Sequence, residues 1–303
     1  MVRKKDRLPL HCQPASHGAL CRPLLVPSRE SPSLLEAIAI YIAAGLLAGF
    51  VSGLFGVGGA FTMTPALIIA LPLQGVLDSQ VMHLTAGTAL AVMATTSIYV
   101  AVLRFRVGDL HLPLMFRFVP FIVAGAVGGS LVGDALPGIV LKIIFIGFVG
   151  LAIVRGIFQR QAATVEGGGD FSAINGPSLW THGTLTGVTG ALLGPGPAVI
   201  ISPYLRAARY PMPVIAATCS ALAGLLGFAA AGGYVFGGFN ETGLPALSLG
   251  YLYLPAFAGL AIGALAGSPF GIRASHKVAD KLLHRAFIGY LAFILVVTLT
   301  QLR

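Results

Sequence analysis

The stretch Leu46–Leu67, LLAGFVSGLFGVGGAFTMTPAL, reads as an apolar helix that is interrupted at Gly56-Val57-Gly58-Gly59 and resumes before Pro65. Each glycine weakens a helix by about 1 kcal/mol relative to alanine, so this cluster favours an unwound turn. In lipid, unpaired backbone groups are costly, and unwound backbone persists only where it is buried in protein or lines a polar cavity. The stretch therefore predicts a helix that is broken at membrane depth.

The same pattern recurs 138 positions later in the chain. The coinciding pairs are Leu47/Leu185, Gly49/Gly187, Leu54/Leu192, Gly56/Gly194, Gly58/Gly196, Ala60/Ala198, Pro65/Pro203 and Leu67/Leu205. Beyond the break, Gly125, Gly129 and Gly133 correspond to Gly259, Gly263 and Gly267. The chain therefore reads as a duplication with one glycine-rich break in each half.

The composition is that of a membrane protein that crosses the bilayer several times. Of the 303 residues, 56% are hydrophobic and only 10% are charged, against about a quarter in a soluble domain. The 40 glycines fit this class, because helices in lipid associate through small residues that let backbones approach closely. We expect an all-α integral membrane protein embedded in the lipid bilayer.

The formal net charge of +9 does not indicate a nucleic-acid partner. The basic residues are scattered over short loops and an N-terminal tail, as in the cytoplasmic loops of membrane proteins, and do not form one face. Cys12, Cys21 and Cys219 lack the spacing of metal ligands. We therefore expect no metal, no cofactor and no nucleic acid.

Polar stretches divide the chain into four parts. We predict a disordered basic tail over residues 1–33, a first membrane repeat over 34–158, a linker over 159–177 and a second repeat over 178–303. The predicted apolar segments are 34–55, 60–73, 84–103, 111–133, 138–158, 178–193, 198–205, 213–236, 246–268 and a last helix ending at 302, with a loop over 74–83. This gives about five hydrophobic segments per repeat and 8–10 transmembrane helices.

Loop charge predicts the orientation. If segments alternate sides, Arg106, Arg160, Arg209 and Lys277 fall in the cytoplasm, and Asp78, Asp134 and Glu241 fall outside. The two halves are then inverted repeats. Full crossing by the first segment would place the basic tail outside. Either the segments 34–55 and 60–73 do not both cross the membrane completely, or the basic tail is tolerated on the outer side.

These motifs resemble the TauE/SafE family of membrane permeases, also called sulfite exporters. The resemblance rests on the broken stretch, on TAGTALAV and on the loop RFRVGDL, and it covers about residues 34–302. It implies a multi-pass membrane protein, built by internal duplication, that exports sulfite or small sulfonate-type anions. Two features depart from the family pattern. The second turn is Gly194-Pro195-Gly196-Pro197 instead of a glycine-rich turn, and Ala60 replaces the third glycine of the first turn.

The glycine breaks are the first candidate substrate site. Gly56, Gly58, Gly59, Gly194 and Gly196 would let backbone N–H groups approach an anion, and the helix that resumes there points the positive end of its dipole at the break. The alternative is that these glycines only permit close helix crossing, as expected for Gly125 and Gly129. Pro195 and Pro197 remove two donors, so the second turn would shape the cavity more than bind.

Six hydroxyl side chains complete the candidate set: Ser52, Thr62, Thr85, Thr88, Thr218 and Ser220. Each would donate to an anion or bond back to the carbonyl of the preceding turn. His83 and His182 are candidates for proton coupling, although both sit at predicted segment ends, where an interfacial histidine is common. Arg117 would attract anions into a vestibule or extend to the membrane interface.

Two functions from different classes remain open. The first is a secondary transporter of a small anion, most simply an exporter in the cell inner (plasma) membrane that works by alternating access around the broken helices. The second is a membrane-embedded assembly factor or enzyme. An enzyme would need a nucleophile, a metal set or paired carboxylates at membrane depth, and the sequence offers none, so we expect no catalytic residues and no enzymatic activity.

Overall fold

The computed structural model describes residues 11–12, 21–22, 34–55, 59–158, 177–194, 196–241, 243–275 and 280–300. The chain forms two units, Met1–Pro32 and Ser33–Arg303. In the first unit, the short strands β1 (His11–Cys12) and β2 (Cys21–Arg22) pair antiparallel. The rest of the predicted tail and most of the predicted linker lie outside the described residues.

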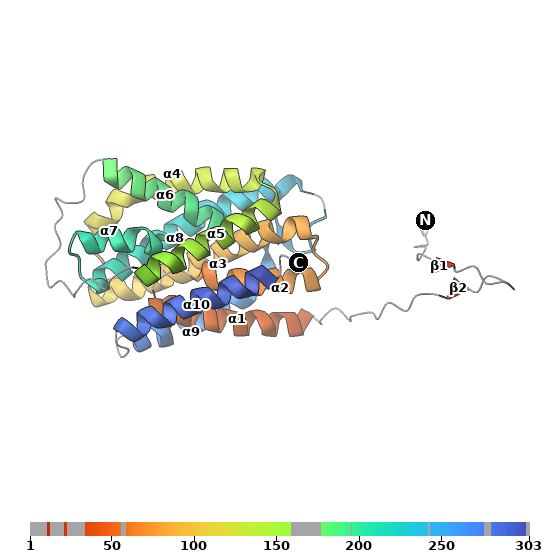
Figure 1. The fold of residues 1–303 in the computed structure, drawn as a ribbon, viewed down its shortest axis with the longest axis horizontal. Helices are drawn as coiled ribbons and strands as arrows, with labels where there is room; N and C mark the ends of the chain where they lie inside the picture. The colour runs from red at the N-terminus through yellow and green to blue at the C-terminus, as the bar shows by residue number, and fades with distance from the viewer. Residues whose placement is uncertain are drawn as a thin grey trace. The chain divides into compact units, whose positions relative to one another are not determined.

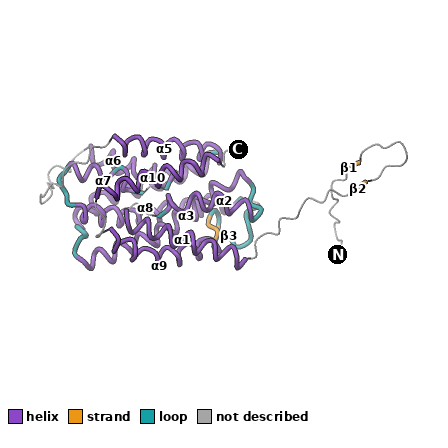
Figure 2. The backbone as a smooth tube through the Cα atoms, turned by 60° about the horizontal axis from the view of Figure 1, so that its bottom comes forward, coloured by secondary structure: helices purple, strands orange, loops and turns teal. Residues whose placement is uncertain are grey.

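The second unit is a bundle of helices that run roughly along one common direction (Figures 1 and 2). The first half contains α1 (Leu34–Phe55), α2 (Ala60–Leu73), α3 (Asp78–Val107), α4 (Leu112–Ala135) and α5 (Gly138–Phe158). The second half contains α6 (Pro177–Leu193), the 3₁₀ turn η1 (Pro197–Val199), α7 (Ile201–Ala207), α8 (Met212–Gly237), η2 (Gly238–Asn240), β3 (Ser248–Leu249), β4 (Leu252–Tyr253), α9 (Leu254–Ser275) and α10 (Asp280–Thr300).

Several helices match the dimensions of a bilayer. Within the described residues, four stretches are long and apolar enough to cross a membrane: Asp78–Val107, Leu112–Ala135, Pro213–Asn240 and Leu254–Ala274. Shorter apolar helices accompany them at Ile38–Leu54, Thr62–Pro72, Gly138–Val154 and Ile288–Thr300. The protein is thus a mostly helical, multi-pass membrane protein.

Three acidic residues, Asp78 at the start of α3, Asp134 at the end of α4 and Glu241 after η2, mark one end of the bundle, here called the acidic end, which also holds the loops 74–77 and 136–137 and the segment 241–253. The ring nitrogen Nε2 of His83 lies 3.1 Å from the carbonyl oxygen of Leu136, which brings the start of α3 to the α4–α5 loop. A Cβ added at Gly237 would lie 2.6 Å from the carboxyl carbon of Asp134, which brings the end of α8 to the same place.

The opposite end, here called the basic end, contains loops 108–111 and 208–211. Tyr204 of α7 stacks on His182 of α6 and makes an edge contact with Phe118 of α4, with ring centroids 4.5 Å and 6.2 Å apart. Arg106, in the last turn of α3, and Arg209, in the loop before α8, belong to this end. Arg160 and Lys277, which we predicted on the same face, lie outside the described residues.

Helices of one half pack mainly against helices of the other. The principal pairs are α1 with α9, α4 with α6, α3 with α8, and α4 with α8, and α5 also packs against α10. In Figure 2, α1 and α9 lie side by side along one edge of the bundle, and α5 and α10 along another. The first helix of each half therefore contacts the fourth helix of the other half.

Glycines make two of these contacts possible. Cβ atoms added at Gly45 and Gly49 of α1 would collide with the backbone oxygens of Leu260 and Ala264 on α9. At the α4–α6 contact, a Cβ at Gly129 would lie 2.8 Å from the carbonyl oxygen of Val188. Close backbone approach at small residues is a main source of helix association in lipid, so these glycines hold the two halves together.

The structure corrects two predicted segment boundaries. The stretch 74–83 is not all loop, because α3 begins at Asp78, where a carboxylate favours the positive end of the helix dipole. The stretch 246–268 is not one helix either. It opens with the β3–β4 hairpin, in which Gly250 adopts a φ of +54°, and α9 follows only at Leu254.

Candidate functional site

The second glycine turn is a sharp change of chain direction between α6 and α7. Gly194 and Gly196 have φ angles of +76° and +63°, which side chains with a Cβ rarely adopt. The N–H of Gly194 donates to the carbonyl of Gly190 at 2.8 Å, so this donor closes the last turn of α6. The glycines at this turn therefore set the backbone path, and the Gly194 N–H is not available to a ligand.

The first glycine turn joins α1, which ends at Phe55, to α2, which begins at Ala60. Gly56 and Gly58 lie outside the described residues. Gly59 is the buried N-cap residue of α2, and a Cβ added there would lie 3.7 Å from Cβ of Ser52. Two of the predicted site residues, Ser52 and Gly59, are thus neighbours in the interior.

A small cavity of about 10 Å³ lies where α2, α3, α5 and α6 meet, with room for about one water molecule. Its lining residues are Thr64, Met82, Thr85, Ala86, Ala89, Leu90, Phe145, Leu192, Leu193 and Gly194. The hydroxyl of Thr64 donates to the carbonyl of Ala60 at 2.9 Å. The hydroxyl of Thr85 is buried in this largely apolar setting without a hydrogen-bond partner. Thr85 is therefore a polar group in the cavity wall whose hydroxyl has no partner within the protein.

The other predicted hydroxyls have different surroundings. Thr88 accepts a hydrogen bond from the backbone N–H of Tyr253 at 3.1 Å, and Ser220 donates to the carbonyl of Ala216 at 2.8 Å. The side chain of Thr62 hydrogen-bonds with Tyr290 of α10. The buried hydroxyl of Thr218 on α8 has no partner. The structure therefore brings Thr85 and Gly194 together at one cavity, and it gives Thr62, Thr88 and Ser220 partners within the protein.

The candidate histidines are placed by aromatic stacking. His83 is buried and stacks on Tyr251 with ring centroids 5.0 Å apart. His182 is half-buried, and its Nδ1 lies 2.7 Å from the carbonyl oxygen of Ser178. Sequence reasoning placed both at segment ends, but His83 lies inside α3 because that helix begins earlier than expected.

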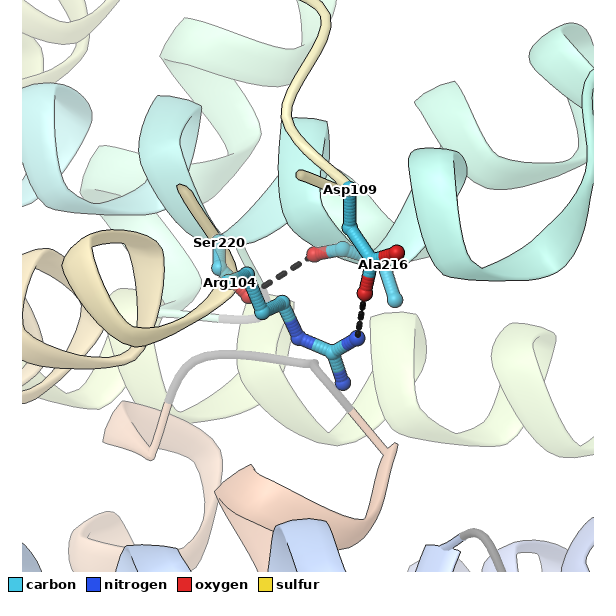
Figure 3. Close-up of polar contacts among 4 residues, drawn as sticks. All are labelled: Arg104, Asp109, Ala216 and Ser220. Carbon is cyan, nitrogen blue, oxygen red and sulfur yellow. Dashed lines mark hydrogen bonds and ion pairs between the residues drawn. The ribbon is translucent and has the colours of Figure 1, made fainter. Parts of the chain in front are cut away.

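Sequence reasoning missed one buried charge. It assigned Arg104 to a basic loop, whereas the structure places this side chain in the last turns of α3, only 8% exposed, with one guanidinium nitrogen 3.9 Å from a carboxylate oxygen of Asp109 (Figure 3). The signal in the sequence was the Gly108-Asp109 pair, which follows the two arginines after Val107.

No group of three or more His, Cys, Asp or Glu side chains suited to a metal ion occurs among the residues that the structure describes. The polar atoms near the cavity and the glycine turns are hydroxyls and backbone groups. Such groups recognise small polar or anionic molecules through hydrogen bonds.

Comparisons with known proteins agree with a role in membrane transport. A probable membrane transporter protein of Haemophilus influenzae is 26% identical over 267 residues, which cover 87% of this chain and 97% of the relative. A probable membrane transporter protein of Methanocaldococcus jannaschii is 24% identical over 256 residues, 82% of this chain and 90% of the relative. No solved structure matches the chain. The profile of the sulfite exporter TauE/SafE family matches residues 41–298. The chain belongs to the TauE/SafE family, and it is a membrane transporter.

Proposed function

We propose that the protein is a secondary transporter that exports a small anion, sulfite or a small organosulfonate, across the cell inner membrane. The observation that carries the proposal is the Thr85 hydroxyl, which is buried without a partner beside Gly194 in a cavity between the two halves. A buried hydroxyl without a partner destabilises the fold by about 1–3 kcal/mol. In a transporter, this cost is offset when the hydroxyl forms a hydrogen bond with the substrate.

The two halves are proposed to be inverted repeats that move against each other. In support, Tyr41 in the first turns of α1 accepts a hydrogen bond from Gln74 at the acidic end, whereas His182 in the first turns of α6 contacts Tyr204 at the basic end. The two halves thus begin at opposite ends of the bundle. The reciprocal pairs α1–α9 and α4–α6 agree with the same two-fold relationship. Inverted repeats of this kind provide alternating access around a central site.

The chemistry of the candidate site suits a small oxyanion. The N–H groups of Thr62 and Met63 donate to the carbonyl of Gly59, so the N–H groups of Ala60 and Phe61 precede the first hydrogen bonds of α2, and the positive end of the helix dipole lies there. The Thr85 hydroxyl, which lines the cavity, adds a further donor to this environment. The present cavity holds about one water molecule, so this conformation is closed to an anion of several heavy atoms. We propose that substrate enters when the halves separate at the glycine turns.

The test is flux through the purified protein in proteoliposomes. Sulfite, sulfoacetate and sulfate are each loaded, and efflux is measured with and without a pH gradient. We expect Thr85→Val to reduce flux per inserted molecule at least about tenfold, because a hydrogen bond to a charged group contributes about 1.5–3 kcal/mol. The melting temperature should stay equal or rise, because the unpaired hydroxyl is gone.

Thr96→Val is the matched control. Thr96 lies on the same helix, is fully buried, and donates to the carbonyl of Val92 at 2.9 Å, so its hydroxyl already has a partner. This variant should keep its flux. Absence of flux for every anion with correctly folded wild-type protein would reject the transport proposal and favour an assembly role. Equal flux in Thr85→Val and the wild type would remove Thr85 from the site.

A further inference from the structure

Arg104 is a buried cation whose hydrogen-bonding capacity is only partly used. Its side chain is 8% exposed, and its Nε has no hydrogen-bond partner. The ion pair with Asp109 spans 3.9 Å, longer than the about 2.7–2.9 Å of a direct charge-assisted hydrogen bond. A buried charge without close partners is strongly unfavourable. Charged residues inside membrane segments are accordingly rare, and they mark the paths of ions and substrates.

The backbone around Gly108 explains why Asp109 stands beside this arginine. Gly108 ends α3 with a φ of +86°, and the N–H of Asp109 donates to the carbonyl of Arg104 at 3.1 Å. This left-handed cap turns the chain back over the last turn of the helix. The Asp109 side chain is 25% exposed, so this carboxylate reaches solvent at the basic end while Arg104 is buried.

The surroundings of Arg104 on the other side belong to the second half of the chain. Figure 3 shows Ala216 and Ser220 of α8 close to Arg104, as expected from the packing of α3 against α8. Among the described residues, Asp109 is the acidic neighbour of the guanidinium. Arg104 therefore sits at the contact of α3 with α8, where the two halves meet.

From this arrangement we propose that Arg104 is the charge-compensating residue for the transported anion at the basic end, and that Asp109 is an internal counter-ion which the anion displaces. The inference rests on the proposed function. In the empty protein the carboxylate partly neutralises the buried guanidinium. An oxyanion that reaches Arg104 takes the place of this carboxylate, because guanidinium donors match oxyanion geometry and form short charge-assisted hydrogen bonds. The Asp109 side chain then turns to the solvent.

The proposal predicts opposite effects for the two partners. Arg104→Gln should raise the KM for anion flux at least about tenfold, because it removes a charged hydrogen-bond donor. Asp109→Asn should lower the KM about threefold or more, because it removes the competing carboxylate while keeping the side-chain shape. Arg104→Lys keeps the charge but not the fork of donors, so its KM should lie between those of the wild type and Arg104→Gln.

The experiment measures proteoliposome flux of sulfite per inserted molecule over a range of concentrations, together with the sulfite-induced shift of the melting temperature in detergent. Arg106→Gln is the matched control, because Arg106 lies on the same final turns of α3 but is exposed, and its KM should not change beyond twofold. Should Arg104→Gln fail to fold, the fall in KM of Asp109→Asn still decides the question.

A purely structural ion pair would give a different result. In that case both Arg104→Gln and Asp109→Asn would lower the melting temperature, and the KM of folded protein would stay at the wild-type value, which overturns the inference while leaving the transport proposal intact. If the wild-type protein shows neither flux nor a thermal shift with sulfite, sulfoacetate or sulfate, the proposed function and this inference fail together.

Discussion

The hydroxyl oxygen of Thr88 on α3 accepts a hydrogen bond from the backbone N–H of Tyr253 at 3.1 Å, and this contact is buried. The two residues come from different halves of the chain. One position earlier, a Cβ at Gly87 would collide with the carbonyl oxygen of Tyr251. The β3–β4 hairpin therefore lies directly on α3, with a glycine that permits the approach and a threonine that fixes it.

Replacing Thr88 by valine should destabilise the protein. The variant leaves the buried N–H of Tyr253 without an acceptor, which costs about 1–3 kcal/mol, whereas Thr88→Ser keeps the acceptor oxygen. We expect Thr88→Val to lower the melting temperature clearly and Thr88→Ser to lower it little. Thermal unfolding in detergent measures both. Equal stability of the two variants would mean that the contact contributes nothing.

Adjacent glycines on α4 should respond in opposite ways to alanine. A Cβ at Gly129 would lie 2.8 Å from the carbonyl oxygen of Val188, so Gly129→Ala forces α4 and α6 apart and should destabilise by about 1–3 kcal/mol. A Cβ at Gly128 meets no atom within 4 Å, so Gly128→Ala should stabilise by about 0.5–1 kcal/mol. Melting curves of the two variants measure both changes in stability. A stable Gly129→Ala would show that the helix contact is looser than described.

A substitution in the first glycine turn should distinguish a role in transport from a role in helix packing. We predict that Gly58→Val abolishes anion flux while the protein still inserts and stays monodisperse, because a side chain would fill the space in which substrate approaches the backbone. Gly129→Val should lose stability and flux together. The measurements are flux per inserted molecule and a melting curve for each variant.

Two outcomes would contradict this view of Gly58. Normal flux in Gly58→Val would exclude the turn from the substrate path. Flux lost only in proportion to folded protein would make the turn a structural element, like the glycines of the α4–α6 contact.

The accessibility of cysteines introduced near the loops should depend on the charge of those loops, because basic loops are expected in the cytoplasm. In a background with Cys12 and Cys21 replaced by serine, the remaining Cys219 is buried and should not react. We expect Arg106→Cys and Arg209→Cys to be protected from an impermeant thiol reagent in intact cells, and Asp78→Cys and Glu241→Cys to react. Labelling of Arg106→Cys and Asp78→Cys from the same side would contradict the orientation.

Helix positions in the membrane were predictable because apolar length is set by the bilayer. The predicted boundaries 34–55, 60–73 and 138–158 coincide with α1, α2 and α5. The start of α3 was missed because polar residues such as Gln80 suggest a loop, although here they are buried by protein and not exposed to lipid. The hairpin at 248–253 was missed because an apolar stretch next to a helix was read as its first turns.

The candidate site was predictable only in part. Glycine and threonine near a break suggest a site, and Thr85 and Gly194 do meet at one cavity. Which hydroxyl remains free depends on partners that lie far away in the sequence, such as Tyr253 for Thr88. The burial of Arg104 depends on α8 in the same way, since the sequence shows only a basic loop.

Because helices of one half pack against helices of the other, the order of synthesis determines when these contacts can form. During synthesis α1 enters the membrane long before α9, the helix that its glycines Gly45 and Gly49 contact. The glycine face of α1 must therefore wait beside lipid or the insertion machinery until most of the chain has emerged. The first half cannot complete its packing alone, and a truncated chain that ends before α9 would be a substrate for quality-control proteases.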